Sequence, residues 1–310
     1  MSAGALQEDG GGDATPAPLS ETGSWIHRTA LGVSVGSVVP GHKPDPAPLA
    51  FFRALRQGWQ VRRTLWLLVQ RDFKVRYRAQ ALGLLWSFAN PLVMMAILSI
   101  VFVKVMKVPV PHFPVFLLIG QLLWQFLNNS VTAGTASLID NTQIVKRTVY
   151  PRQLVPIAAV LSHLLNFVME CLMLVAFVVV FPDAYRLSPW LLFLPIIVGI
   201  QVVFLFGVTM ATSALNVVYR DIFYLVTSVL LVLFWLTPVV YSTDMVPPWL
   251  QTILAANPLT GVITSAREII MHGRAPNPRL LGTAAAAALA VFLAGAAVFR
   301  KYDRVVSDYL

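Results

Sequence analysis

Long runs without Asp, Glu, Lys or Arg recur through this chain of 310 residues and restrict what it can fold into. Five such runs cover residues 79–103, 108–139, 187–219, 222–243 and 280–299, and another, from residue 153, is interrupted only by Glu170. Each is long enough to cross roughly 30 Å of hydrocarbon as a helix. With 57% hydrophobic and 12% charged residues, the chain cannot bury its apolar surface inside a soluble fold of this length. We therefore expect an integral membrane protein.

The runs predict an all-α fold, because an α-helix satisfies its own backbone hydrogen bonds in lipid. Six transmembrane helices are expected, at approximately 83–106, 113–138, 154–181, 189–216, 222–241 and 279–299, within one membrane domain that covers residues 83–305. Residues 1–48 are rich in Gly, Pro, Ala and acidic residues and predict a disordered tail.

The distribution of positive charge predicts that both termini are cytoplasmic, because Lys and Arg in short loops are retained on that side of the membrane. In this topology most of the 23 Lys and Arg residues face inward. The topology and contact with anionic lipid account for the net charge of +9. Nucleic acid is not an expected partner, since no aromatic-basic binding module is visible.

A basic amphipathic segment, residues 60–82, precedes the first expected span. Its apolar residues recur at every fourth position from residue 65 to Tyr77, which predicts an interfacial helix in the inner headgroup region. Arg76 fits neither its apolar nor its basic stripe and is expected to extend toward the headgroups. The alternative is a simple basic flank of the first span. The polar residues assigned to this helix, with Tyr77, are Arg71, Lys74, Arg76 and Arg78.

The third expected span contains an unusual polar set, His163, Asn166 and Glu170, which share one helical face. A central charge costs about 2.5 to 3.5 kcal/mol on insertion scales, so such groups usually face protein or water. Packing against a neighbouring helix is favoured over a proton relay. Cys171, the only cysteine, excludes an internal disulfide and is expected to be a packing residue.

Residues 245–274 contain a double proline and an Asn257-Pro258 pair. Arg267 and Glu268 argue against a seventh span, which would also move the basic C-terminus outside. Two re-entrant half-helices broken at Asn257 are expected, because irregular backbone survives at membrane depth only where protein or water covers it. An external loop is the alternative. Arg267 and Arg274 would then meet a lipid phosphate or an anionic linker, although pairing of Arg267 with Glu268 explains these two charges equally well.

Five blocks of the sequence follow one another in a recognisable order. They are RDFKVRYRAQALGLLWSFANPLVMMAILSIVF at 71–102, TVYPRQLVPIA at 148–158, NVVYRDI at 216–222, FWLTPVVYS at 234–242 and NPLTGVI at 257–263. The sequence from about residue 60 to 305 thereby resembles the membrane subunits of type-2 ABC exporters of cell-surface polysaccharide, the O-antigen (Wzm-like) and teichoic-acid (TagG-like) permeases. The resemblance implies a permease of the bacterial plasma (inner) membrane that exports a lipid-linked polysaccharide of O-antigen, teichoic-acid or actinobacterial galactan type.

The chain has no Walker-type G-x-x-x-x-G-K-[ST] loop. ATP and Mg²⁺ are therefore expected on a partner, and this chain is expected to have no catalytic residue, cofactor or metal of its own. The resemblance implies two ABC ATP-binding subunits and a second copy of the chain. A drug or small-lipid exporter of the same superfamily stays open as an alternative. An integral-membrane transferase is less favoured, because the five His residues are dispersed.

A short polar segment, residues 140–152, separates the second and third expected spans. Asp140 and Asn141 predict the cap of a short helix, which Pro151 ends. An ordinary basic loop is the alternative, whereas the resemblance implies a coupling helix that docks on the ATPase. A second loop holds an Arg-Asp pair that would fix the geometry between two spans or touch the ATPase. The residues assigned to coupling are Asp140, Asn141, Lys146, Arg147, Tyr150, Pro151, Arg152, Tyr219, Arg220 and Asp221.

Aromatic residues are the candidates for lining a sugar path, because their rings stack on sugar faces and let a polymer slide. Trp and Tyr are also enriched at membrane interfaces whatever the function. The resemblance favours the group without selecting its members. The candidates are Trp86, Phe88, Trp124, Phe126, Phe234, Trp235 and Tyr241.

Overall fold

The computed structural model describes residues 59–77, 85–107, 109–147 and 151–309. All of them belong to one compact unit of the chain, Asp45–Leu310. These residues form helices and connecting segments without a strand, which confirms the all-α class. The predicted tail, residues 1–48, lies outside the described residues.

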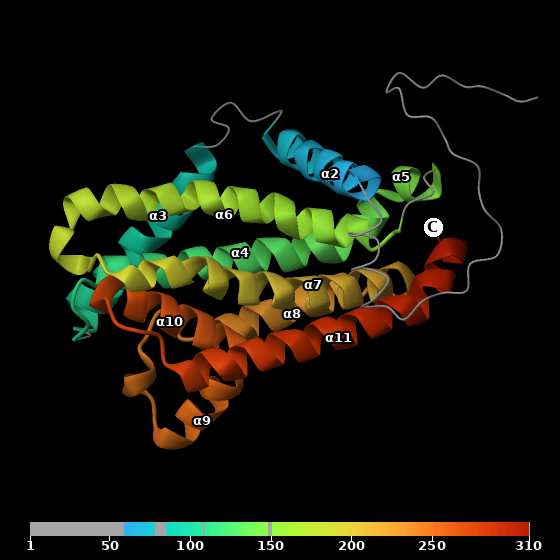
Figure 1. The fold of residues 1–310 in the computed structure, drawn as a ribbon. Coiled ribbons are helices and arrows are strands. Elements are labelled where there is room, and N and C mark those ends of the chain that lie inside the picture. The colour runs from blue at the N-terminus through green and yellow to red at the C-terminus, as the bar shows by residue number, and fades with distance from the viewer. Residues whose placement is uncertain (1–58, 78–84, 108, 148–150, 310) are drawn as a thin grey trace, which may run out of the picture. The chain divides into compact units, whose positions relative to one another are not determined.

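Helices occupy each of the six ranges expected from the sequence, and several of them run side by side (Figure 1). In chain order the helices are α2 (Trp59–Tyr77), α3 (Leu85–Ser99), the π-helix η1 (Ile100–Val105), α4 (Phe113–Asp140), α5 (Thr142–Arg147), α6 (Leu154–Val180), the 3₁₀ turns η2 (Pro182–Ala184) and η3 (Pro189–Phe193), α7 (Leu194–Val218), α8 (Ile222–Trp235), η4 (Thr243–Met245), α9 (Pro248–Ala256), α10 (Pro258–His272) and α11 (Pro278–Tyr309).

Four of the described helical segments are long and apolar enough to cross a membrane. They are Phe88–Val105, Leu154–Phe177, Pro189–Val218 and Pro278–Asp303. Helix α8 is apolar but has only 14 residues, which extend over about 21 Å. The chain is therefore a multi-pass helical membrane protein, and the count of six crossings stays a prediction.

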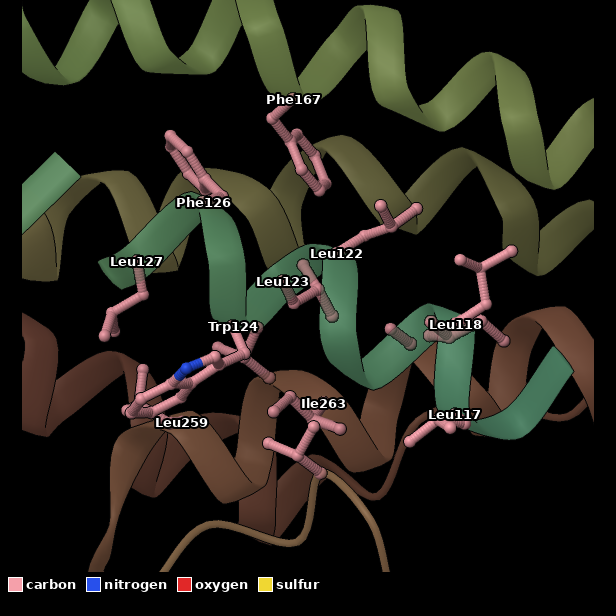
Figure 2. Packing of buried hydrophobic residues seen from close by; sticks show 14 of the residues in the cluster. Leu117, Leu118, Leu122, Leu123, Trp124, Phe126, Leu127, Phe167, Leu259 and Ile263 are labelled. Atoms are coloured by element: carbon pink, nitrogen blue, oxygen red, sulfur yellow. The ribbon is translucent and has the colours of Figure 1, made fainter. Parts of the chain in front are cut away.

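Helix α4 forms the centre of the core and packs against α3, α6, α7, α8 and α10. Its side chains are buried on almost every side over the first two-thirds of its length. Figure 2 shows Phe126 of α4 facing Phe167 of α6, while Leu259 and Ile263 of α10 approach α4 from the other side. The Phe126 and Phe167 rings are stacked with their centroids 5.1 Å apart.

Helices α7 and α11 pack along each other more extensively than any other described pair. Two glycines, Gly207 of α7 and Gly295 of α11, face each other where the backbones meet. A Cβ on Gly207 would lie 2.5 Å from the carbonyl oxygen of Val291 and 2.6 Å from Cα of Phe292. Small residues allow this approach, which strengthens van der Waals packing between helices in lipid.

Candidate functional site

The predicted coupling segment begins where α4 ends. Asp140 is the last residue of α4 and is exposed, and α5 starts two residues later. The Asn141 side chain donates from Nδ2 to the carbonyl oxygen of Ser137, at 2.8 Å. It therefore caps the C-terminal end of α4 rather than the start of α5, because its amide reaches an open carbonyl of the helix before it. Tyr150 and the side chains of Lys146 and Arg147 lie outside the described part.

Arg71 connects the interfacial helix to this junction. Its Nη2 donates to Oδ1 of Asn141, 70 residues further along the chain. The same guanidinium donates to Oδ1 of Asp72, at 2.6 Å from Nη2 and 3.1 Å from Nε. Asp72 holds the guanidinium in place, so α2 is tied to the α4–α5 corner through two side chains.

Arg152 ties the other end of the segment to α11. Its Nη1 lies 3.1 Å from the carbonyl oxygen of Asp303 and 3.6 Å from Oδ1 of the same residue. Between the two ties, Val145 of α5 is buried in a cluster with Met210 of α7 and Phe299 of α11. The short helix is thus seated on the bundle and fastened on both flanks, while Pro151 is exposed.

The second predicted contact loop leaves Tyr219, Arg220 and Asp221 exposed between α7 and α8. Neither charged residue forms an ion pair with another described residue, so the Arg-Asp pair does not fix this turn. Asn216 fixes it instead. Its Nδ2 donates to the carbonyl oxygen of Thr135 (3.1 Å), and its Oδ1 accepts from the N–H of Phe223 (3.2 Å). This role of Asn216 was not predicted from the sequence, although a polar amide within the uncharged run 187–219 could have indicated it.

The polar set of the third expected span is buried and meets α2. Nη1 and Nη2 of Arg76 lie 3.1 and 2.8 Å from Nδ1 and Nε2 of His163. The prediction that Arg76 extends toward the headgroups is therefore wrong, because a buried imidazole on α6 offers its guanidinium a partner. Asn166 Nδ2 donates to Glu170 Oε1 at 2.6 Å within α6.

The rest of α2 packs on α6 through Leu68 and Val69, which meet Leu154 and Ala158. Lys74 is exposed. The Tyr77 side chain and Arg78 lie outside the described residues.

Arg267 of α10 is buried, and three backbone carbonyls accept hydrogen bonds from it. Its Nε, Nη1 and Nη2 donate to the carbonyl oxygens of Phe116 (3.1 Å), Pro238 (2.6 Å) and Val239 (2.6 Å). The guanidinium carbon also lies 3.4 Å from the centroid of the Phe116 ring. The predicted pairing with Glu268 and the predicted contact with a lipid phosphate are both wrong. The buried Arg267 side chain instead donates to carbonyl oxygens in the first turn of α4 and just after α8.

The break between α9 and α10 falls at Asn257, as the sequence predicted. Its Oδ1 accepts from the N–H of Leu259 at 3.0 Å and caps α10. Its Nδ2 donates to Oγ1 of Thr237, at 3.1 Å, just beyond α8. The start of α10 is therefore joined to the end of the short helix α8.

The candidate aromatic residues divide by burial. Trp124 and Phe126 are buried in the core, where Trp124 meets Phe234 edge-on at 5.3 Å between centroids. Their burial favours packing, and Phe88 and Phe234 are partly buried against the same core. Trp235 is 59% exposed. Tyr241 donates its hydroxyl to the carbonyl oxygen of Trp235 at 3.0 Å. The Trp86 side chain lies outside the described residues, and a lining role for any of these stays a prediction.

A family model described as ABC-2 type transporter matches residues 63–271 of the chain. An O-antigen export system permease protein RfbA from Klebsiella pneumoniae is 38% identical over 207 residues, which cover 67% of this chain and 80% of the relative. A protein of the same name from Myxococcus xanthus is 33% identical over 253 residues, or 80% and 96% of the two chains. The polysialic acid transport protein KpsM of Escherichia coli is 24% identical, with 81% and 98% covered.

Proposed function

The chain belongs to the ABC-2 type transporter family, and we propose that it is the permease subunit of an ATP-driven exporter of a lipid-linked cell-surface polysaccharide. Relatives that align over most of their length are named for O-antigen export and polysialic acid transport. Both names describe the movement of a cell-surface polysaccharide, which favours this substrate class over a drug.

The proposed topology has six crossings of the bacterial plasma membrane and both termini in the cytoplasm. In this arrangement α9 and α10 enter from the outer face and turn back at Asn257. Two observations support the re-entrant path. The cap of α10 is bonded to Thr237 beside the end of α8, and α10 is buried along most of its length, so protein covers the interrupted backbone.

The proposed partners are two ABC ATP-binding subunits, which bind ATP and Mg²⁺, and a second copy of this chain. The seating of α5 is the observation that carries the coupling role. A push on this helix would be transmitted through Asn141 to Arg71 on α2 and through Arg152 to Asp303 on α11. An unattached basic loop would transmit no such displacement.

The exposed apolar face of α8 is a candidate for contact with the second copy of the chain or with the exported polymer. Only Val226 and Leu230 of this helix are buried within the chain. Tyr224, Val229 and Trp235 are each more than half exposed. In our proposal a path for the lipid-linked polymer lies between the two copies, and Trp235 and Tyr224 are exposed aromatic residues of α8 that could meet sugar there.

Charge reversal of α5 tests the coupling role. We expect the double variant Lys146→Glu, Arg147→Glu to insert into the membrane normally and to lose ATPase association and export. The double variant Lys104→Glu, Lys107→Glu makes the same charge change at the other end of the bundle and should retain both. If the α5 variant still binds the ATPase and exports normally, the segment is only a topological anchor.

Depletion of the protein in its host tests the substrate class. A lipid-linked glycan should accumulate in the cytoplasm, and its analysis would identify the exported polymer. An unchanged pool of every lipid-linked glycan would contradict polysaccharide export and favour a drug or small-lipid substrate. Failure to purify with any co-expressed ATPase would contradict the permease role itself.

A further inference from the structure

A cavity of about 580 Å³ lies at the end of the bundle that holds the connection between α6 and α7. Helices α4, α6, α7 and α10 contribute to its wall, and fourteen of its sixteen lining residues are apolar. Its volume falls within the range of about 300–1,000 Å³ that is usual for small-molecule sites. Val175 on its wall is 64% exposed. Two nearby apolar residues of the same helix, Val168 and Leu172, are each 55% exposed. The cavity therefore adjoins a surface of the kind that meets lipid.

Two polar residues, Tyr185 and Arg186, stand among the apolar ones at this cavity. The Tyr185 hydroxyl oxygen is buried and has no hydrogen-bond partner among the described residues. Burial raises the pKa of Tyr185 to about 12, so this phenol is a hydrogen-bond donor at neutral pH. The Arg186 side chain forms no hydrogen bond or ion pair with any described residue. Both residues have unused capacity to donate to an anion.

The position of Arg186 is fixed by α10. Its backbone N–H donates to the carbonyl oxygen of Ile270, at 3.0 Å. Gly273, which ends α10 with φ of +63°, lies against it, and a Cβ there would be 2.9 Å from Cβ of Arg186. Only glycine adopts this conformation readily and leaves the space. The backbone of Arg186 is thus fixed beside the cavity that its side chain lines.

Arg186 also lines a second hollow of about 650 Å³, in which seven of the fourteen lining residues are polar. Arg274 and His272 contribute to this hollow, and so do two acids, Asp183 and Asp244. The two guanidinium groups and the two carboxylates balance in charge. Arg186 therefore lines both an apolar cavity and a mixed hollow whose two arginines and two aspartates offset each other in charge.

We propose that these two hollows together bind a zwitterionic phospholipid of the surrounding membrane. One hydrocarbon chain occupies the apolar cavity, the phosphate accepts hydrogen bonds from Arg186 and Tyr185, and the headgroup amine lies with Asp183 and Asp244. Because a lipid chain in a bilayer is already in hydrocarbon, selectivity for the site must come from the phosphate and the amine. In the proposed six-crossing topology this end of the bundle faces outward, so the lipid would come from the outer leaflet. That placement rests on the proposed function, whereas the binding itself does not depend on transport.

Native mass spectrometry of the purified, delipidated full-length protein tests the site with added palmitoyl-oleoyl phosphatidylethanolamine. Arg186→Gln should weaken binding about tenfold or more, because a charge-assisted hydrogen bond is lost. Leu174→Trp should weaken it by filling the cavity, which Leu174 lines. Arg300→Gln removes an exposed guanidinium near the other end of α11 that lines neither hollow and should leave binding unchanged. Diacylglycerol with the same chains should bind about tenfold more weakly than the phospholipid.

Equal binding of diacylglycerol, or unchanged binding by Arg186→Gln, would overturn the phosphate contact. Stronger binding of phosphatidylglycerol would overturn the zwitterionic assignment. Preference for a polyprenyl phosphate would also overturn the proposal and would point instead to the carrier lipid of the exported glycan. Because the assay uses the purified chain without an ATPase, its failure leaves the export experiment unaffected, and a failure of export leaves this assay interpretable.

Discussion

The contact between α7 and α11 offers a sharp test of what holds this bundle together. Replacing Gly207 with Ala would place a Cβ 2.5 Å from the carbonyl oxygen of Val291, whereas ordinary van der Waals contact begins at 3.4 Å. Both neighbours are backbone atoms, so no side-chain rotation relieves the overlap. The two helices must separate locally by about 0.9 Å, and a gap of 0.5–1 Å forfeits about a quarter to a half of each affected dispersion contact.

Gly199 supplies a matched control on the same helix. A Cβ at Gly199 meets nothing within 4 Å. Both substitutions replace glycine with alanine in a helix and so gain the same helix propensity, about 0.8–1 kcal/mol. The difference in unfolding free energy between the two variants therefore reports the steric overlap at Gly207 alone. Overpacking of this kind costs about 1–3 kcal/mol. We expect Gly207→Ala to be about 2 kcal/mol less stable than Gly199→Ala, or roughly thirtyfold in the unfolding equilibrium.

The assay is unfolding of the purified full-length protein in mixed micelles, followed by far-UV circular dichroism as the fraction of denaturing detergent rises. Gly207→Ala should unfold at a lower fraction than the wild type, and Gly199→Ala at the same or a higher one. Equal midpoints for the two variants would refute the reasoning. Equal midpoints would mean that the close approach of the α7 and α11 backbones adds no stability beyond that of a wider helix crossing.

Three further substitutions address the polar contacts. Arg267→Met leaves three carbonyl oxygens without their donor and should destabilise the protein by about 3 kcal/mol or more in the same assay, whereas Arg279→Met should not; equal midpoints would contradict a structural role. Asn141→Ala removes the acceptor of Arg71 and should preserve ATPase binding while lowering export per ATP hydrolysed; an unchanged ratio would show that this tie transmits nothing. Glu170→Gln keeps an acceptor for Asn166, so export and assembly should both be unchanged, and loss of export with intact assembly would restore the proton relay.

Much of the helical framework was predictable because its determinants are local. The predicted spans at 113–138, 154–181 and 189–216 coincide closely with α4, with α6 and with η3 plus α7, since charge and proline mark where each run can begin and end. The break at Asn257 was likewise readable from an Asn-Pro pair, because the cap and the helix start involve only adjacent residues. The burial of Glu170 was predicted from the cost of a charge at membrane depth, whereas its hydrogen bond to Asn166 lies within α6 and not with a neighbouring helix.

The site contacts were not predictable, because they join residues that are far apart in sequence. Arg71 bonds Asn141 across 70 positions, and Arg267 bonds Phe116 across 151. Arg76 was expected at the headgroups, since nothing in its own helix reveals the imidazole of His163 on α6. Each pairing depends on how two helices are rotated relative to each other, which local sequence does not specify.

The sequence by itself determined a membrane-embedded helical chain with no nucleotide loop of its own, because composition and charge spacing decide where a chain can reside. Only the tertiary structure decided which basic side chains lie at the surface and which donate hydrogen bonds inside the bundle. Arg186 and Arg267 both stand in short polar intervals, yet Arg186 is exposed beside two hollows, whereas Arg267 is buried and bonded to three backbone carbonyls. The physical reason is that a guanidinium is satisfied by whatever acceptors the packed helices bring to it.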